Sequence, residues 1–286
     1  MTYIVHGATG AQGSPVLSSL AARGASPIAA VRTPETLPAG TASVAVDLSD
    51  ADALTGIYRG AKGVFIHLPM GAPADAKAQA AAIATAVTTA RPDRVVISTS
   101  GQIIDQPGSP LQAPDNSPLM TLIREVTAAG VSTAVVAPRL YLENLLLPVI
   151  AGPAREEGVL RYPLPETFPV SWSSHLDVAA TVAHLLTDPT ITGNVAVGHL
   201  PALTGPDLAS AFTSHLGRDV HFEAITPDAF GELITPLFGP AAAPVIALYQ
   251  ALNTQDGNVI AEANSAQKLL GLSPRPITQW LSELGV

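Results

Sequence analysis

Short apolar runs recur through the first half of the chain, separated by segments with apolar residues at helical spacing or by turns rich in Gly and Pro. A continuous apolar run predicts a strand that is buried on both faces, as in a parallel sheet covered by helices on its two sides. The predicted strands are 3–6, 27–31, 43–46, 63–68, 94–97 and 132–137. The predicted helices are 14–23, 51–58, 74–90 and 119–129. This alternation indicates an α/β protein, a doubly wound parallel-sheet Rossmann fold.

The alternation weakens in the second half of the chain. The apolar stretch 140–150 predicts a helix, and Pro-rich loops are expected around Tyr162 and Phe168. Further elements are predicted as helices at 176–186 and from 204 onward, a short strand at 195–197, and one or two short helices between 265 and 284. We therefore expect one lobe at residues 1–135 and a smaller C-terminal lobe made mainly of residues 136–286, with some segments returning to the main sheet.

Three glycines spaced three apart follow the first predicted strand, in the stretch Gly7-Ala8-Thr9-Gly10-Ala11-Gln12-Gly13. The first glycine permits a sharp exit from the strand, the second lets a pyrophosphate approach the backbone, and the third lets the next helix pack closely. The free N–H groups at the start of that helix attract phosphate charge. Pro15 suits a first helical turn, which tolerates a residue without an N–H. The pattern predicts a dinucleotide site; a Gly-rich turn without a ligand is the alternative.

Composition narrows the possible functions. The chain has 286 residues, of which 47% are hydrophobic and 13% charged, so a large core is expected and disorder is not. A net charge of -9 argues against a nucleic-acid partner. Cysteine is absent and no His-Glu-x-x-His spacing occurs, so we expect no metal. Without a signal peptide or an apolar run that we judge long enough to span a bilayer, we expect a cytoplasmic protein with no membrane partner.

Two positions at predicted strand ends suit the adenosine half of a dinucleotide. Arg32 ends the second strand about twenty residues after the glycines, where an acidic residue favours NAD and an Arg can pair with the 2′-phosphate of NADP. We therefore predict NADP(H) in preference to NAD(H), the alternative being a solvated Arg. Asp47 and Leu48 end the third strand, and we predict that they contact the adenine.

The next strand ends carry polar residues at the same edge of the predicted sheet. His67, followed by Leu68 and Pro69, is a candidate for contact with the cofactor ribose or the substrate. Ser98 and Thr99 are also expected at the cofactor. Ser100 is the residue that a reductase would use to bond a substrate oxygen. The segment 115–120, where a Tyr-x-x-x-Lys pair is usually found, contains neither Tyr nor Lys.

The second lobe has to supply the remaining chemistry in this interpretation. Tyr141, Tyr162 or His175 can provide a proton, although each can instead be a packing residue. Tyr141 and Ser100 are our predicted catalytic residues. The predicted substrate pocket consists of Tyr141, Leu145, Phe168, Trp172 and His175.

The glycine stretch resembles the GATGxxG signature of atypical short-chain dehydrogenases. The segment 131–144 is similar to the one that follows the sixth strand in NmrA-like proteins, where it reads close to V-P-Y-T-I-L-R-P-G-F-F-M-E-N. The C-terminal pattern of Trp172, Asp177-Val178-Ala179 and Leu269-Leu270-Gly271 is similar too. The resemblance covers nearly the whole chain.

This resemblance implies a Rossmann fold with a small C-terminal lobe and NADP bound by Gly7, Thr9, Gly10, Gln12, Gly13 and Arg32. We expect the cofactor also to contact Ala11, Pro138 and Leu140. The sequence departs from the family pattern in two places. Ala137 stands where an Arg is usual, with Arg139 two positions further on, and Leu119 stands near the expected Lys.

Together these features predict an NADPH-dependent reductase of the atypical short-chain type that lacks the Tyr-x-x-x-Lys pair. Its expected substrate is a small apolar molecule, quinone-like or aromatic, which accepts hydride readily when it is held over the nicotinamide. The alternatives are a non-catalytic NADP-binding redox sensor and a non-redox biosynthetic enzyme. Either a monomer or a homodimer is compatible with the sequence.

Overall fold

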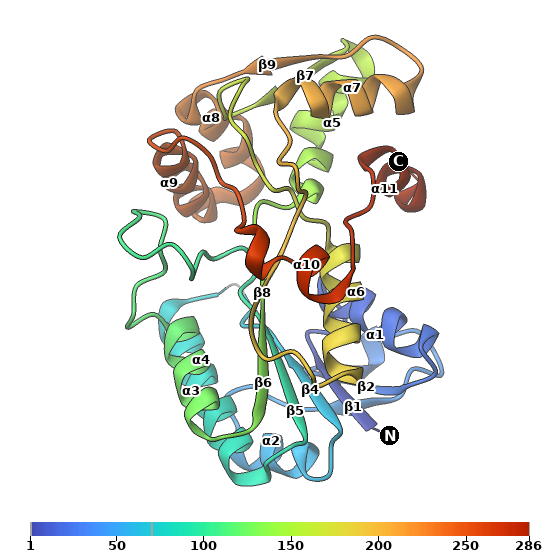
Figure 1. The fold of residues 1–286 in the computed structure, drawn as a ribbon, viewed down its shortest axis with the longest axis vertical. Coiled ribbons are helices and arrows are strands. Elements are labelled where there is room, and N and C mark those ends of the chain that lie inside the picture. The colour runs from blue at the N-terminus through green and yellow to red at the C-terminus, as the bar shows by residue number, and fades with distance from the viewer. Residues whose placement is uncertain (1, 70, 286) are drawn as a thin grey trace.

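Seven strands form a single parallel sheet in the order β3-β2-β1-β4-β5-β6-β8 (Figure 1). The computed structural model describes residues 2–69 and 71–285. The strands are β1 Thr2–His6, β2 Ser26–Val31, β3 Ser43–Ala45, β4 Gly63–Ile66, β5 Arg94–Ser98, β6 Ser132–Pro138 and β8 Gly193–Val197. This sheet confirms the predicted α/β Rossmann fold. The strand order reverses between β1 and β4, and doubly wound sheets bind ligands at the carboxyl edge beside such a reversal.

Helices cover both faces of the sheet, and alternate strand residues supply the two cores. Val5 and Phe65 pack on one side, whereas Ile4 and Ile66 pack on the other. Because both faces are covered, nearly every strand position is apolar, which explains the continuous apolar runs in the sequence. The covering helices are α1 Gly13–Ala22 and α6 His175–Thr187 on the first side, and α2 Ala51–Tyr58, α3 Pro73–Ala90 and α4 Pro118–Ala128 on the second.

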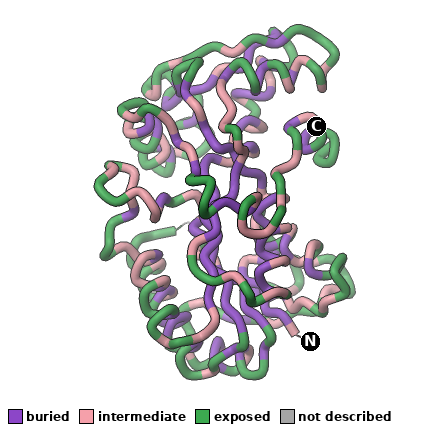
Figure 2. The backbone as a smooth tube through the Cα atoms, viewed as in Figure 1, coloured by how far each residue is buried: buried purple, intermediate pink, exposed green. Residues whose placement is uncertain are grey.

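The second lobe has its own core, which is rich in aromatic residues. Tyr162, Trp172, Phe230 and Tyr249 pack there, and neighbouring ring centroids are as close as 5.3 Å. The lobe contains the 3-10 helix η2 Leu142–Leu146, α5 Pro148–Glu156, β7 Val159–Tyr162, α7 Gly205–Leu216, β9 His221–Ala224, α8 Pro227–Phe238, η3 Gly239–Ala241, α9 Ala242–Leu252 and α11 Ile277–Leu284. The remaining elements are η1 Pro34–Thr36, η4 Glu262–Asn264 and α10 Ala266–Leu270. Figure 2 shows buried backbone along the sheet and on the inner side of this lobe.

Two predictions for the second half are wrong in detail. The stretch 140–150 is not one helix, because η2 ends at Leu146 and α5 begins at Pro148, a residue that starts helices but cannot continue one. Tyr162, predicted in a loop, is the last residue of β7, which pairs in parallel with β9. A strand whose partner lies some sixty residues away (Val159 pairs with His221) leaves little local signal.

The expectation that no apolar run is long enough to span a bilayer is wrong, because one helical stretch has the length and the apolar composition that this requires. Residues 227–252 form a helical stretch of 26 residues with a mean hydropathy of 1.4 in its most apolar window. The structure divides this stretch into α8 and α9, of 12 and 11 residues, which pack against each other. Each helix is shorter than the roughly 20 residues that a membrane-spanning helix needs.

Segments beyond residue 135 do return to the main sheet. Strand β8 pairs with β6, and α6 packs against α1. The N-terminus of α6 thereby reaches the carboxyl edge of the sheet, close to the second lobe (Figure 1). The lobe boundary at residue 135 stays a prediction.

Candidate functional site

The glycine stretch forms a tight turn between β1 and α1. Gly7 has a φ of +60°, and its carbonyl accepts a hydrogen bond of 2.8 Å from the Gly10 N–H. A Cβ on Gly13 would lie 2.3 Å from the Gly7 carbonyl oxygen and 2.6 Å from that of His6. Gly7 thus supplies the left-handed backbone and Gly13 the close packing of helix on strand, which are the two structural roles predicted for them.

The outer part of this turn is open to solvent. Thr9, Gly10 and Ala11 are exposed, and no acidic residue lies in the first turn of α1. The Gln12 side chain does not cap the helix. The Ser14 N–H already donates to the Gly10 carbonyl at 3.1 Å and Pro15 has no N–H, so the Gly13 N–H is the donor that the start of α1 leaves for an anion. This cradle suits a pyrophosphate.

Gln12 instead connects the turn to the end of β5. Its Nε2 donates to Ser100 Oγ at 3.1 Å, and its Oε1 accepts from Ser98 Oγ at 2.8 Å. Ser100 has a φ of +54°, a conformation that is uncommon for a residue other than glycine and that concentrates at functional sites. Two of the predicted serines are therefore held together over the turn.

Polar groups without partners are concentrated at the same edge. His67 lies directly over the turn, since a Cβ on Gly7 would be 2.1 Å from its Nε2. This Nε2 and the Thr99 hydroxyl are buried without a hydrogen-bond partner. Buried polar groups normally form hydrogen bonds, and leaving them without a partner costs free energy. A ligand whose hydroxyl or amide groups bonded to them would remove that cost. The turn and these two groups fit a nicotinamide dinucleotide.

Tyr141, which follows β6, and His175, the first residue of α6, cover the end of β5. Their ring centroids are 4.4 Å apart, and the Tyr141 ring would lie 3.5 Å from a Cβ on Gly101. The Tyr141 hydroxyl is buried near Ser98 and forms no hydrogen bond of ordinary geometry. Burial raises the pKa of Tyr141 far above its usual value and lowers that of His175 to about 4. Both side chains are therefore uncharged at neutral pH.

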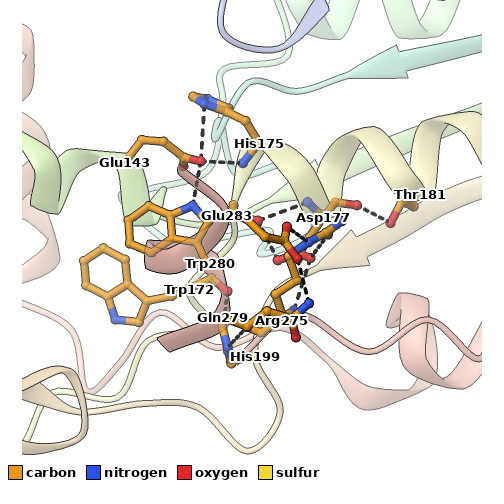
Figure 3. Close-up of polar contacts among 11 residues, drawn as sticks. Glu143, Trp172, His175, Asp177, Thr181, His199, Arg275, Gln279, Trp280 and Glu283 are labelled. Carbon is orange, nitrogen blue, oxygen red and sulfur yellow. Dashed lines mark hydrogen bonds and ion pairs between the residues drawn. The ribbon is translucent and has the colours of Figure 1, made fainter. Parts of the chain in front are cut away.

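Glu143 is a residue of this edge that the sequence interpretation missed. Its Oε1 accepts from the His175 backbone N–H at 2.9 Å and from Trp280 Nε1 at 3.2 Å, and lies 3.7 Å from His175 Nδ1 (Figure 3). Burial raises the pKa of Glu143, although these hydrogen bonds oppose the shift. Figure 3 also shows Arg275 bridging Asp177 and Glu283, which fastens the C-terminal segment to α6.

The adenosine end of the predicted site has a different character. Arg32 is exposed and forms no salt bridge or side-chain hydrogen bond with the residues that the structure describes. The Asp47 carboxylate accepts from the hydroxyl and N–H of Ser49, which holds its pKa below the usual value. Leu48 is half-buried beside the core of the sheet.

The remaining residues predicted to contact the cofactor or the substrate lie at several positions in the fold. Leu68 packs against the core of the sheet, Pro69 is exposed, and Pro138 ends β6. Leu140 and Leu145 belong to the core of the second lobe.

Phe168 and Trp172, two predicted pocket residues, also belong to that core. They line a cavity of only about 10 Å³. An aromatic substrate does not fit there, so their predicted role in the pocket has no support from the packing. Tyr162, considered as a proton source, is buried and hydrogen-bonded to Tyr249, which leaves Tyr141 and His175 at the sheet edge.

The displaced Arg139 has a structural partner. Its side chain is 1% exposed, and its Nη2 donates to both carboxylate oxygens of Asp105 at 2.8 and 2.9 Å. The pair anchors the loop that follows β5 and neutralises the charge of Arg139. Nothing in the local sequence indicated Asp105 as the partner, since the residues are 34 positions apart.

Solved structures share this fold along their whole length. The NADPH-dependent quinone oxidoreductase of Escherichia coli in complex with NADPH superposes with a TM-score of 0.79 at 19% identity, covering 100% of both chains. The triphenylmethane reductase of Citrobacter sp. in complex with NADP(H) gives a TM-score of 0.81 at 17% identity, covering 99% of both. At these identities the similarity establishes the fold.

Two curated proteins are similar in sequence. The NAD(P)H azoreductase of Xenophilus azovorans is 31% identical over 202 residues, which cover 70% of this chain and 68% of that protein. The (4-alkanoyl-5-oxo-2,5-dihydrofuran-3-yl)methyl phosphate reductase of Streptomyces griseus is 29% identical over 289 residues, covering 98% of this chain and 96% of that one. The model of the NmrA-like family matches residues 1–281. The chain therefore belongs to the NmrA-like family.

Proposed function

We propose that this protein is an NAD(P)H-dependent oxidoreductase that prefers NADPH and reduces a small conjugated molecule, quinone-like or aromatic. The observation that carries the proposal is the coincidence of two features at one sheet edge. An open glycine turn suited to a pyrophosphate lies beside His67 and Thr99, whose buried polar atoms lack partners. The Tyr141 and His175 rings cover the neighbouring strand end.

The proposed cofactor contacts follow the strand ends across the sheet. The turn from Gly7 to Gly13 and the start of α1 hold the pyrophosphate, and Arg32 pairs with the 2′-phosphate. Asp47 and Leu48 border the adenine. His67, Ser98 and Thr99 serve the ribose and the nicotinamide. When bound, NADPH supplies a hydride to the acceptor.

The substrates named for the similar proteins share one chemical property. Quinones, azo compounds, triphenylmethane dyes and an alkanoyl dihydrofuranone that carries a phosphate all contain a conjugated, electron-poor double bond. Such bonds accept hydride once they are positioned, so a site without a Tyr-Lys pair can still support the reaction. We propose the same substrate class for this protein.

The charges at the reactive end favour an uncharged substrate. His67 and His175 are neutral at pH 7 because burial lowers the pKa of each. The charge of the Arg139 guanidinium is neutralised by Asp105, which it binds through Nη2, although its Nε and Nη1 are buried without a hydrogen-bond partner. Among the described residues around Ser100 and Tyr141, no other cationic side chain is available to hold a phosphate or carboxylate. We therefore expect a neutral apolar acceptor rather than a phosphorylated one.

A redox sensor that binds NADP without turnover is the second candidate. It is favoured by the raised pKa of Tyr141, which makes this phenol a weak acid, and by the lack of Tyr and Lys in segment 115–120. Cofactor binding is common to both candidates, and only turnover separates them.

The test combines binding with turnover. NADPH and NADH are titrated by fluorescence into the wild type, Arg32→Gln and the control Arg23→Gln, which changes an exposed Arg at the other end of α1. We expect Arg32→Gln to weaken NADPH binding by about 10- to 100-fold, the worth of a charged hydrogen bond, and to leave NADH binding unchanged. NADPH oxidation is then followed with menadione as acceptor. Equal affinity for both cofactors contradicts the NADPH preference, and tight binding without oxidation of NADPH by any acceptor favours the sensor.

A further inference from the structure

The reduction of a conjugated acceptor needs a proton as well as a hydride, and Tyr141, Tyr162 and His175 are the side chains considered above as its source. Tyr162 is excluded because its hydroxyl is committed to Tyr249 inside the aromatic core. Tyr141 is a poor donor because its hydroxyl is buried and ionises only with difficulty. His175 remains, with a side chain that is 16% exposed.

The imidazole of His175 has two close neighbours. The Tyr141 ring packs against it at a centroid distance of 4.4 Å. Glu143 Oε1 lies 3.7 Å from His175 Nδ1 and accepts a hydrogen bond from the backbone N–H of the same residue (Figure 3). A carboxylate beside one imidazole nitrogen fixes the orientation of the ring and stabilises its protonated form, which leaves the other nitrogen to face a reacting group.

Glu143 is itself fixed by the end of the chain. Trp280, fully buried on α11, donates its Nε1–H to Glu143 Oε1 at 3.2 Å. The second carboxylate oxygen, Oε2, is buried without a partner. A buried carboxylate with a free oxygen is costly unless a nearby cation or proton compensates it, and the imidazole of His175, whose Nδ1 lies 3.7 Å from Oε1, is a titratable group beside it.

This inference rests on the proposed function. We propose that His175 is the proton donor of the reduction and that Glu143 is a positioning residue, which orients the imidazole and stabilises its protonated form. The acceptor gains a hydride from NADPH, which is the reductant, and negative charge develops on the acceptor's conjugated oxygen or nitrogen. The N–H bond of the His175 imidazolium breaks, the proton bonds to that atom, and the electron pair stays on the neutral imidazole. Solvent then returns a proton to His175.

The His175–Glu143 pair predicts that the reduction is fastest at acidic pH. Burial lowers the pKa of His175 and raises that of Glu143, so the two groups take up one proton over a shared acidic range. The other titratable or charged groups facing the pair are Tyr141, His67 and Asp177, the last of which is paired with Arg275. The rate of the proton-coupled step therefore decreases as the pH rises above that range.

One test measures the interaction between His175 and Glu143 without relying on turnover. The titration of His175 is followed by NMR of its ring nitrogens with NADP⁺ present and absent, and His175→Asn identifies the signal. Glu143→Gln keeps an oxygen for the His175 and Trp280 donors but removes the charge. It should lower the His175 pKa by roughly 1 unit or more. The control Glu223→Gln, which removes an exposed carboxylate from β9, should leave the pKa unchanged. An unchanged pKa in Glu143→Gln overturns the proposal.

The second test is kinetic, with NADPH and menadione. We expect His175→Asn to lower kcat by about 100-fold or more, the usual contribution of a general acid, and to abolish the decrease of kcat with pH. Glu143→Gln should shift that decrease to lower pH with KM unchanged. Wild-type kcat and pH profile in His175→Asn would overturn the assignment. A His175 pKa that responds to Glu143→Gln in a protein without turnover on any acceptor would contradict the proposed function while leaving the pair intact.

Discussion

At the scale of single residues, the three glycines of the turn are required for different structural reasons. Gly7 needs its backbone conformation, and Gly10 lies at the exposed surface where a ligand would approach. Gly13 needs the absence of a side chain, because its Cβ position is occupied by backbone atoms that cannot move aside. The same residue type therefore serves three physical purposes within one motif.

Gly13→Ala should be severely damaging for this reason. The new methyl would meet the Gly7 carbonyl oxygen at 2.3 Å, so α1 has to move away from β1. We expect a loss of about 1–3 kcal/mol in the free energy of unfolding, the usual cost of overpacking, together with weaker NADPH binding. Urea denaturation and fluorescence titration measure the two effects.

Gly56→Ala is the matched control. Gly56 is exposed inside α2, and a Cβ there meets nothing within 4 Å. The substitution should stabilise the protein by about 0.5–1 kcal/mol through helix propensity, with cofactor binding unchanged. Equal stability of the two variants would refute the packing role of Gly13.

At the scale of elements, helix α6 links the sheet to the candidate site. Its apolar face packs on the sheet core, while its first residue is His175. Ser174 caps the helix, since its hydroxyl accepts from the Asp177 N–H at 3.0 Å and donates to the Asp177 carboxylate at 2.6 Å. The position of the imidazole thus depends on how firmly this helix begins.

Ser174→Ala should lower the free energy of unfolding by about 1 kcal/mol, the typical worth of a helix cap, as measured by urea denaturation. Ser214→Ala provides the comparison. Ser214 is exposed within α7 and returns its hydroxyl to the Ser210 carbonyl of the same helix, so its loss should cost nothing. If both variants lose the same free energy of unfolding, the Ser174 cap does not stabilise the protein more than an ordinary exposed helix serine does.

At the scale of the whole molecule, buried neutral histidines couple stability to pH. Burial lowers the pKa of His6 to about 3, against about 6.5 for an unperturbed histidine. Burial also lowers the pKa of His67 and His175. In each case the unfolded chain binds the proton more readily than the folded protein does, so stability is greatest above pH 6.5 and decreases on acidification. The raised pKa of Glu143 acts in the opposite direction and offsets part of this loss.

We therefore expect the free energy of unfolding to decrease between pH 6.5 and pH 4. The slope should approach about 1.4 kcal/mol per pH unit for each histidine that stays neutral only when folded. Urea denaturation at a series of pH values measures it directly. A free energy of unfolding that is constant from pH 7 to pH 5 would contradict this account.

The sequence alone determined the sheet and the glycine turn. Continuous apolar runs such as Val95-Val96-Ile97 predict strands covered on both faces, and the spacing of Gly7, Gly10 and Gly13 predicts a strand, a turn and a helix. Both signals are local, since they depend on residues a few positions apart and on backbone sterics that act in any context.

The tertiary structure decided which polar side chains meet. Gln12 and Ser100 are 88 positions apart, Glu143 and Trp280 are 137 apart, and β7 finds its partner strand only through the packing of the second lobe. No periodicity links such positions, because their contact depends on strand order and on where the C-terminal segment packs. The sequence therefore indicated where a dinucleotide would lie, whereas folding brought together His175 and Glu143, the pair to which we assign proton transfer in our proposal.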